Sequence, residues 1–135
     1  MADPKEVLER SRTIAVVGIA RTTDKPSGSV PAELQRRGFR IIPVNPKADT
    51  ILGEKAYAAL TDVHEPVDVV EVFRPADEAP EIARQAVAVG AKTLWLQLGI
   101  ESEEAGKIAA DGGLDFVQDR CMGADARRFD IRKPA

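Results

Sequence analysis

The residues of this sequence that could do chemistry lie at the ends of short apolar runs, where glycines, hydroxyl groups and basic side chains occur together. They are Gly18, Ile19, Ala20, Arg21, Thr22, Lys25, Pro26 and Ser27, then Asn45, Pro46 and Lys47, then Phe73, Arg74 and Pro75, then Gln97, Leu98 and Gly99. Backbone N–H groups at turns and helix N-termini bind anions, and lysine or arginine adds positive charge. The pattern indicates a site for a phosphorylated ligand, if the fold brings these segments together.

Each of these residues also has an ordinary structural explanation when taken alone. Gly18 after a strand is often only a turn glycine, and a single lysine is by default a solvated surface charge. Asn45-Pro46 is typical of a turn. Gly18-Ile19-Ala20 is not the GxGxxG fingerprint, and no GxxxxGK[ST] run exists. The functional interpretation therefore depends on whether the segments meet at one edge of the fold.

The apolar runs that precede these residues are predicted to be strands covered on both faces. They are rich in Val, Ile and Leu with little alternation, which is typical of parallel strands sandwiched between helices. The five runs are Thr13–Ile19, Arg40–Val44, Val67–Phe73, Thr93–Leu98 and Leu114–Gln118.

Helices are predicted between most of these strands. Asp3-Pro4-Lys5-Glu6 has the residue types of a helix start, and the Gly38, Gly90 and Gly112-Gly113 positions are typical helix ends. The connection from Asn45 to Pro66 contains Pro and Gly and is expected to form only a turn or two of helix around Tyr57–Leu60. The later predicted helices are Ser27–Arg37, Asp77–Val89 and Ser102–Ala110.

Alternating strands and helices with right-handed crossovers predict an α/β fold. We expect a single Rossmann-like domain over residues 1–135, with a doubly wound parallel five-stranded sheet of order 3-2-1-4-5 and helices on both faces. Ligands of such sheets bind beyond the carboxyl ends of the strands, where the winding direction changes. This rule places the strand-end residues in one site.

Composition excludes several classes of function. The chain has 135 residues, one cysteine and one histidine, which excludes a disulfide framework and a Cys/His metal cluster. The formal net charge of −3 gives no electrostatic basis for nucleic-acid binding. No apolar run approaches the roughly 20 residues of a membrane span. The polar N-terminal segment lacks the core of a signal peptide, so we expect a soluble cytoplasmic protein.

The end of the second strand discriminates between nucleotides. Sites for NAD usually carry an Asp or Glu there, which binds the ribose 2′-hydroxyl. Here the chain reads Val44-Asn45-Pro46-Lys47, with a cation and no carboxylate. A lysine at this place disfavours NAD and favours a ribose that bears a phosphate. NADP and coenzyme A (CoA) both meet that condition.

Several segments together resemble the stand-alone CoA-binding domain family, which is similar to the N-terminal Rossmann-like CoA-binding domain of the succinyl-CoA synthetase α subunit. The resemblance spans Ser11 to Cys121, and VNPK and FRP are its most specific parts. It implies that Gly18–Ser27 and Asn45–Lys47 hold the ADP portion of CoA or acyl-CoA. It also implies that Phe73–Pro75 and Gln97–Gly99 line the rest of the groove. The segments are GIARTTDKPSGSV, GFRIIPVNPK, the spaced residues Leu52-Gly53, Tyr57, Leu60 and Asp62, and then VDVVEVFRP, LWLQLGI and DRC.

The departures from the ligase predict a binding protein without catalytic residues. The ligase subunit has a second domain with a phosphorylated histidine, and the present sequence, ending at Ala135, has no room for it. Its threonine–glutamate pair after the fourth strand appears here as Leu98-Gly99 preceded by Gln97. An alternative is an NADP-dependent oxidoreductase or redox sensor, although Tyr57 is not followed four residues later by the lysine of a Tyr-x-x-x-Lys pair. A third is an interaction domain with a vestigial nucleotide edge. The sequence does not say whether a protein partner supplies catalysis.

The remaining candidates have simpler structural explanations. Cys121 follows the fifth strand and is expected to close the sheet, the sharper hypothesis being a mixed disulfide with CoA. We expect His64 at the surface and Trp95 in the core. The basic tail Arg127–Lys133 is expected to cover the fold, the alternative being a docking segment.

Overall fold

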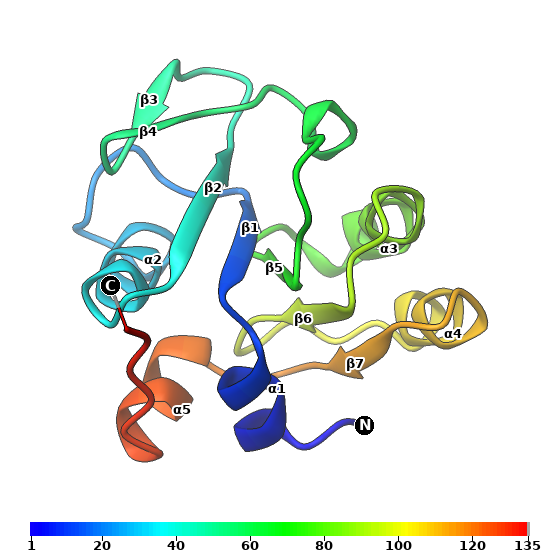
Figure 1. The fold of residues 1–135 in the computed structure, drawn as a ribbon. Helices are drawn as coiled ribbons and strands as arrows, with labels where there is room; N and C mark the ends of the chain where they lie inside the picture. Colours follow the sequence, from blue (N-terminus) through cyan, green and yellow to red (C-terminus); the bar gives the residue numbers. More distant parts are fainter. Residues whose placement is uncertain (135) are drawn as a thin grey trace.

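The computed structural model describes residues 1–134 and contains a parallel five-stranded sheet (Figure 1). Its order is β2-β1-β5-β6-β7. The fold is the predicted α/β Rossmann-like arrangement. The predicted strands are all present, shortened by up to two residues at their ends. Their bounds are β1 Thr13–Val17, β2 Arg40–Val44, β5 Val69–Val72, β6 Thr93–Leu96 and β7 Asp115–Val117.

The observed strand order corrects the predicted one. The third main strand, β5, pairs with β1 on the side away from β2, with Ile14 opposite Val69. In chain order the main strands are therefore arranged 2-1-3-4-5, and 3-2-1-4-5 is wrong. Pro43 gives the physical reason, because the predicted order would have put β2 inside the sheet. A proline cannot donate to a hydrogen-bond ladder and is confined to edge strands.

Helices cover the two faces of the sheet and bury two separate hydrophobic clusters. On one face α1, α2 and α5 pack on alternate strand residues such as Ile14, Val16 and Trp95. On the other face α3 and α4 pack on Ala15, Val70 and Leu94. Trp95 is fully buried, as predicted. The helices are α1 Pro4–Arg10, α2 Pro26–Arg36, α3 Ala79–Ala88, α4 Glu103–Asp111 and α5 Met122–Arg128.

The predicted start signals place two helix N-termini correctly. Asp3 caps α1 by accepting from the Lys5 N–H, and Ser102 caps α4 by accepting from the Ala105 N–H. The third predicted helix begins as the short 3-10 helix η2 (Ala76–Glu78) before α3. Helix α5 was not predicted. It and the following residues to Ile131 pack on the α1/α2/α5 cluster, so the tail covers the fold as expected.

The connection between β2 and β5 contains no long helix, as predicted, but it also forms a small hairpin. Strand β3 (Thr50–Ile51) pairs antiparallel with β4 (Glu54–Lys55), and the chain then reaches the 3-10 helix η1 (Leu60–Asp62). Tyr57 lies beside β2 and exchanges backbone hydrogen bonds with it: its N–H donates to Pro43 O and its carbonyl accepts from the Asn45 N–H, both at 2.9 Å. The connection therefore flanks the end of β2, next to the predicted ligand edge.

Candidate functional site

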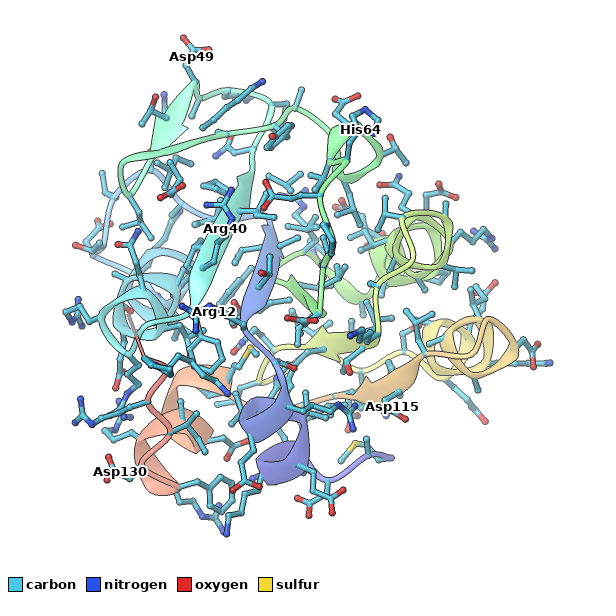
Figure 2. The ribbon with its side chains drawn as sticks, viewed as in Figure 1. Arg12, Arg40, Asp49, His64, Asp115 and Asp130 are labelled. Carbon is cyan, nitrogen blue, oxygen red and sulfur yellow. The ribbon has the colours of Figure 1, made fainter. Side chains whose placement is uncertain are left out.

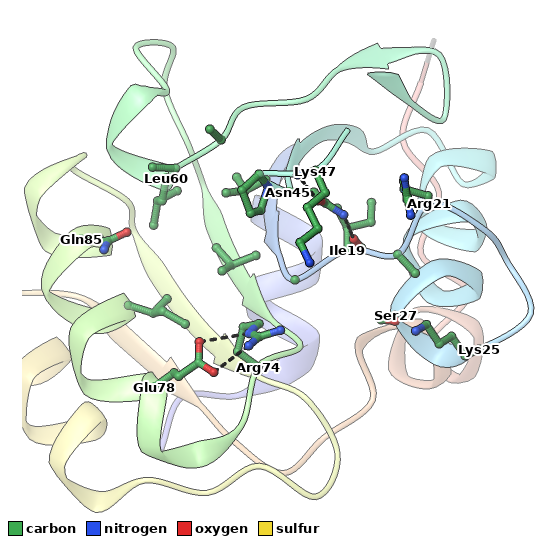
Figure 3. A pocket seen from close by; sticks show the side chains of 18 of the residues that line it. Ile19, Arg21, Lys25, Ser27, Asn45, Lys47, Leu60, Arg74, Glu78 and Gln85 are labelled. Atoms are coloured by element: carbon green, nitrogen blue, oxygen red, sulfur yellow. Dashed lines mark hydrogen bonds and ion pairs between the residues drawn. The ribbon is translucent and has the colours of Figure 1, made fainter. Parts of the chain in front are cut away.

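A groove of about 740 Å³ opens at the carboxyl ends of β1, β2 and β5 (Figure 3). We call it the strand-end groove. Ligand clefts in proteins commonly enclose roughly 300–1,000 Å³, so its size suits a nucleotide-containing molecule. Its lining residues are Val17, Gly18, Ile19, Ala20, Arg21, Thr22, Lys25, Ser27, Val44, Asn45, Pro46, Lys47, Ala58, Ala59, Leu60, Arg74, Glu78, Ile82 and Gln85.

The loop after β1 forms the floor and one side of the groove. Gly18 has φ +86°, and a Cβ there would lie 2.8 Å from both Phe73 O and Arg74 Cδ. Only glycine allows this turn and this close approach. The loop then closes on itself, because the Ala20 N–H donates to Ser27 O at 3.0 Å. The Thr22 hydroxyl donates to Asp24 at 2.6 Å, which lowers the pKa of the Asp24 carboxyl.

The N-terminus of α2 faces the groove from the same side. Lys25 occupies the N-cap position without a side-chain cap, Pro26 opens the helix, and the first turn contains no acidic residue. An N-terminus of this kind carries partial positive charge and N–H groups suited to an anion. Gly28 brings the helix directly against the loop, since a Cβ there would lie 1.7 Å from Thr22 O.

Asn45 ties the ends of β1 and β2 together. Its side-chain Nδ2 donates to Ile19 O at 2.9 Å, and its Oδ1 accepts from the Lys47 N–H at 2.8 Å. The second bond is a typical Asx turn, which fixes the backbone at Lys47. Asn45 therefore determines the position from which Lys47 enters the groove.

The charges of the groove are mostly positive. Arg21, Lys25 and Lys47 are exposed and make no ion pair within the described residues. Figure 3 shows the Lys47 side chain extending into the middle of the groove. Arg74, by contrast, forms two hydrogen bonds with Glu78, Nε to Oε1 at 3.0 Å and Nη2 to Oε2 at 2.7 Å. This pairing raises the pKa of Arg74 and lowers that of Glu78, so both remain charged at neutral pH.

The structure brings most of the predicted site residues to this groove and leaves others outside its lining. Phe73 packs partly into the α1/α2/α5 cluster, and Gln97 is buried beneath the edge. Leu98 is 68% exposed and starts a turn with Gly99, whose N–H donates to Asp119 at 2.8 Å. The predicted residues in the lining are Gly18, Ile19, Ala20, Arg21, Thr22, Lys25, Ser27, Asn45, Pro46, Lys47 and Arg74; those outside it are Pro26, Phe73, Pro75, Gln97, Leu98 and Gly99.

The wall of the groove opposite α2 was not predicted. Part of it is the Ala58–Leu60 segment, which belongs to no long element and follows no main strand. The rest comes from Glu78, Ile82 and Gln85. Their spacing of four and then three residues puts them on one face of a helix, a signal that the sequence did contain.

A buried carboxyl group below the edge was also missed. Glu71 lies in the middle of β5 and is fully buried. One of its oxygens accepts a hydrogen bond from Gln97 Nε2, and the other, Oε1, has no partner among residues 1–134. Burial raises the pKa of Glu71 to about 8, and the Gln97 hydrogen bond opposes that rise. Glu71 is not part of the groove lining.

The other residues considered in the sequence lie away from the groove. His64 is exposed at the surface near η1, as predicted (Figure 2). Cys121 is partly buried against the α1/α2/α5 cluster. Among residues 1–134, no group of three or more His, Cys, Asp or Glu residues could hold a metal ion. Within the same range no helix is both long and apolar enough to cross a membrane.

Comparison with known proteins gives the family of this fold and groove. The CoA binding domain family matches residues 12–127. The chain belongs to this family. The Bacillus subtilis protein YneT, which is uncharacterized, is 38% identical over 121 residues, and the match covers 90% of each chain. This CoA-binding domain is also similar to a solved structure from Thermus thermophilus, with 34% identity and a TM-score of 0.88, covering 95% of this chain and 99% of that one.

The domain also matches part of much larger ligases. It is 35% identical over 100 residues to the ADP-forming acetate–CoA ligase II of Archaeoglobus fulgidus, covering 73% of this chain and 15% of the ligase. A dinucleotide-forming acetyl-coenzyme A synthetase from Candidatus Korarchaeum cryptofilum has the same fold, with 25% identity and a TM-score of 0.71. That match covers 86% of this chain and 27% of the synthetase. The CoA-binding domain is thus homologous to the CoA-binding region of ADP-forming acetyl-CoA synthetases.

Proposed function

We propose that this protein binds coenzyme A, or an acyl-CoA, in the strand-end groove and has no catalytic activity on its own. The observation that carries the proposal is Lys47, which enters the groove from the end of β2, where an NAD site would hold a carboxylate. Membership of the CoA binding domain family supports CoA as the ligand whose ribose phosphate Lys47 contacts.

The remaining features of the groove suit the rest of the ADP moiety. The uncapped N-terminus of α2 and the Gly18–Ser27 loop offer backbone donors and positive charge for the pyrophosphate. On the opposite wall, the apolar side chains of Ala58, Leu60 and Ile82 suit a planar base. Arg74 lines the groove at the end of β5 and adds positive charge for the phosphates. Phe73, Pro75 and Gln97–Gly99 lie outside the lining, at the ends of β5 and β6, where the pantetheine arm would continue.

The first prediction is that CoA binds more tightly than dephospho-CoA, by at least about tenfold in Kd. A charge-assisted hydrogen bond to the ribose phosphate contributes on the order of 1.5–3 kcal/mol, and about 1.4 kcal/mol corresponds to tenfold. Titration calorimetry of both ligands measures the gap. Lys47→Ala should shrink it, whereas Lys107→Ala, an exposed lysine on α4, should leave it unchanged. Equal affinities in the wild type would remove the role given to Lys47.

A thermal-shift series with CoA, acetyl-CoA, NADP and NAD tests the assignment against its alternative. NADP also has a phosphorylated ribose, and Lys47 would contact it in the same way. CoA at about 100 times its Kd should stabilise the protein by about 2.7 kcal/mol. A shift with NADP and none with CoA would support an NADP-dependent oxidoreductase or redox sensor in place of the CoA-binding protein.

The second prediction is that the isolated chain forms no acyl-CoA from CoA, a carboxylic acid, Mg²⁺ and ATP or GTP. Thioester formation by the ligase route needs a phosphorylated histidine, and His64 is exposed and outside the groove. Binding without stabilisation of a transition state accelerates nothing. Chromatographic detection of the thioester is the measurement. Turnover that His64→Ala abolishes would contradict the proposal and make His64 catalytic.

A further inference from the structure

The strand-end groove has one carboxylate in its described lining, and that carboxylate holds one of its four cationic side chains. Glu78 accepts two hydrogen bonds from the Arg74 guanidinium, whereas Arg21, Lys25 and Lys47 have no such partner within residues 1–134. Both side chains remain close to half exposed, 47% for Arg74 and 44% for Glu78. The pair is therefore within reach of a ligand.

The aliphatic part of the Arg74 side chain packs on the turn after β1. Its Cδ lies 2.8 Å from the position that a Cβ on Gly18 would take. The guanidinium then extends from that turn to Glu78 at the start of α3, as Figure 3 shows. The guanidinium is therefore placed to contact an anion bound over the end of β1.

The two bonds to Glu78 use the Nε hydrogen and one Nη2 hydrogen of Arg74, which is the two-pronged face that best matches a carboxylate or phosphate. A phosphate that seeks the same face must displace Glu78. A phosphate that binds the remaining N–H groups of Arg74 must lie close to the negative charge of Glu78. In either case Glu78 opposes the binding of an anion.

We propose that Glu78 is a specificity-determining residue that competes with the phosphates of the ligand for Arg74 and so weakens anion binding in the groove. The inference rests on the proposed function, because CoA is the anion concerned. It predicts that the groove discriminates against ligands that place a further negative charge beside Arg74. While no ligand is bound, the Glu78 carboxylate occupies the face of the Arg74 guanidinium that a phosphate would use.

The test is the affinity of CoA for Glu78→Gln, measured by calorimetry. Freeing the Nε and Nη2 hydrogens of Arg74 for a phosphate should tighten binding about three- to tenfold. Glu81→Gln is the matched control, since Glu81 lies one turn further along α3, pairs with Arg84 and does not line the groove. It should bind CoA like the wild type. Melting curves without ligand establish that each variant is folded.

Arg74→Gln, which keeps most of the aliphatic stem, tests whether Glu78 acts through Arg74. It should bind CoA more weakly than the wild type, and adding Glu78→Gln to it should recover little. Equal or weaker binding by Glu78→Gln alone would overturn the inference, as would a full gain in both backgrounds. If the wild type binds no CoA, both the proposed function and this inference are overturned. Either of the two contrary results for the Glu78→Gln variants would overturn the inference alone and leave the proposed binding of CoA unaffected.

Discussion

Raising the pH from 5 to 8 is expected to destabilise the wild-type protein much more than a Glu71→Gln variant. Glu71 is fully buried in the central part of the sheet, and its Oε1 has no hydrogen-bond partner in the part of the chain that the structure describes. Burial raises its pKa from 4.5 to about 8, so the folded protein keeps this carboxyl protonated over a range in which the unfolded chain releases the proton.

The direction of the effect follows from proton linkage. Between the two pKa values the folded state binds more protons than the unfolded state, so stability is fully present below pH 4.5 and falls as the pH rises towards 8. One pKa unit corresponds to about 1.4 kcal/mol, so the loss is on the order of 4 kcal/mol. Glu33 and Glu65 affect the pH dependence of stability only at lower pH, because their arginine partners lower the pKa values of their carboxyl groups.

Urea unfolding at pH 5, 6, 7 and 8 measures this loss. Glu71→Gln keeps the shape and a polar contact with Gln97 but cannot ionise, so its free energy of unfolding should change little over this range. At pH 8 the variant should be the more stable protein. Glu101→Gln, at an exposed position, is the control and should follow the wild type. Parallel curves for wild type and Glu71→Gln would contradict the assignment of a buried, protonated Glu71.

Gly28→Ala should both destabilise the protein and weaken the proposed binding of CoA. The added methyl group would lie 1.7 Å from Thr22 O and 2.8 Å from Thr22 C, and these backbone atoms cannot rotate away as a flexible side chain can. Overpacking of a close contact typically costs about 1–3 kcal/mol, and a backbone neighbour puts this variant at or above the upper end. The loop or the helix must move, and the two together form the proposed pyrophosphate site.

Thermal melting and CoA calorimetry measure the two effects of Gly28→Ala. Ser29→Ala is a suitable control, since Ser29 is the next residue of α2 and is exposed. It should melt and bind like the wild type. A Gly28→Ala variant with wild-type stability and affinity would show that the loop and α2 are not in the tight contact described.

Much of the fold was predictable because strands buried on both faces and capped helices have local signals. The run Thr13–Ile19 and the caps Asp3 and Ser102 are examples. Strand order has no such local signal, because it depends on which neighbour a strand pairs with. Pro43 was the one residue that constrained it, by placing β2 at an edge. Helix α5 was missed because it is short and has no side-chain cap.

The site was predictable where it depends on strand ends and not where it depends on packing between distant segments. Gly18, Asn45 and Lys47 directly follow strands, so the rule for parallel sheets placed them correctly at the edge. Ala58–Leu60 reach the groove only because Tyr57 pairs with β2. The sequence shows Glu71 as a charged residue within the apolar run VDVVEVF. Its burial could not be predicted, because it depends on the sheet and on the contact with Gln97.

Pro43 and Tyr57 together also affect how this protein can associate with other chains. An exposed edge strand is a template for intermolecular strand addition, which leads to aggregation or domain swapping. On the outer side of β2, Pro43 has no N–H to offer, and its carbonyl and the Asn45 N–H are already bonded to Tyr57. Within the described residues, a foreign strand would therefore find no free backbone group between the Pro43 nitrogen and the Asn45 N–H on this side. The segment that walls the groove thus also covers the carboxyl-terminal end of this edge strand.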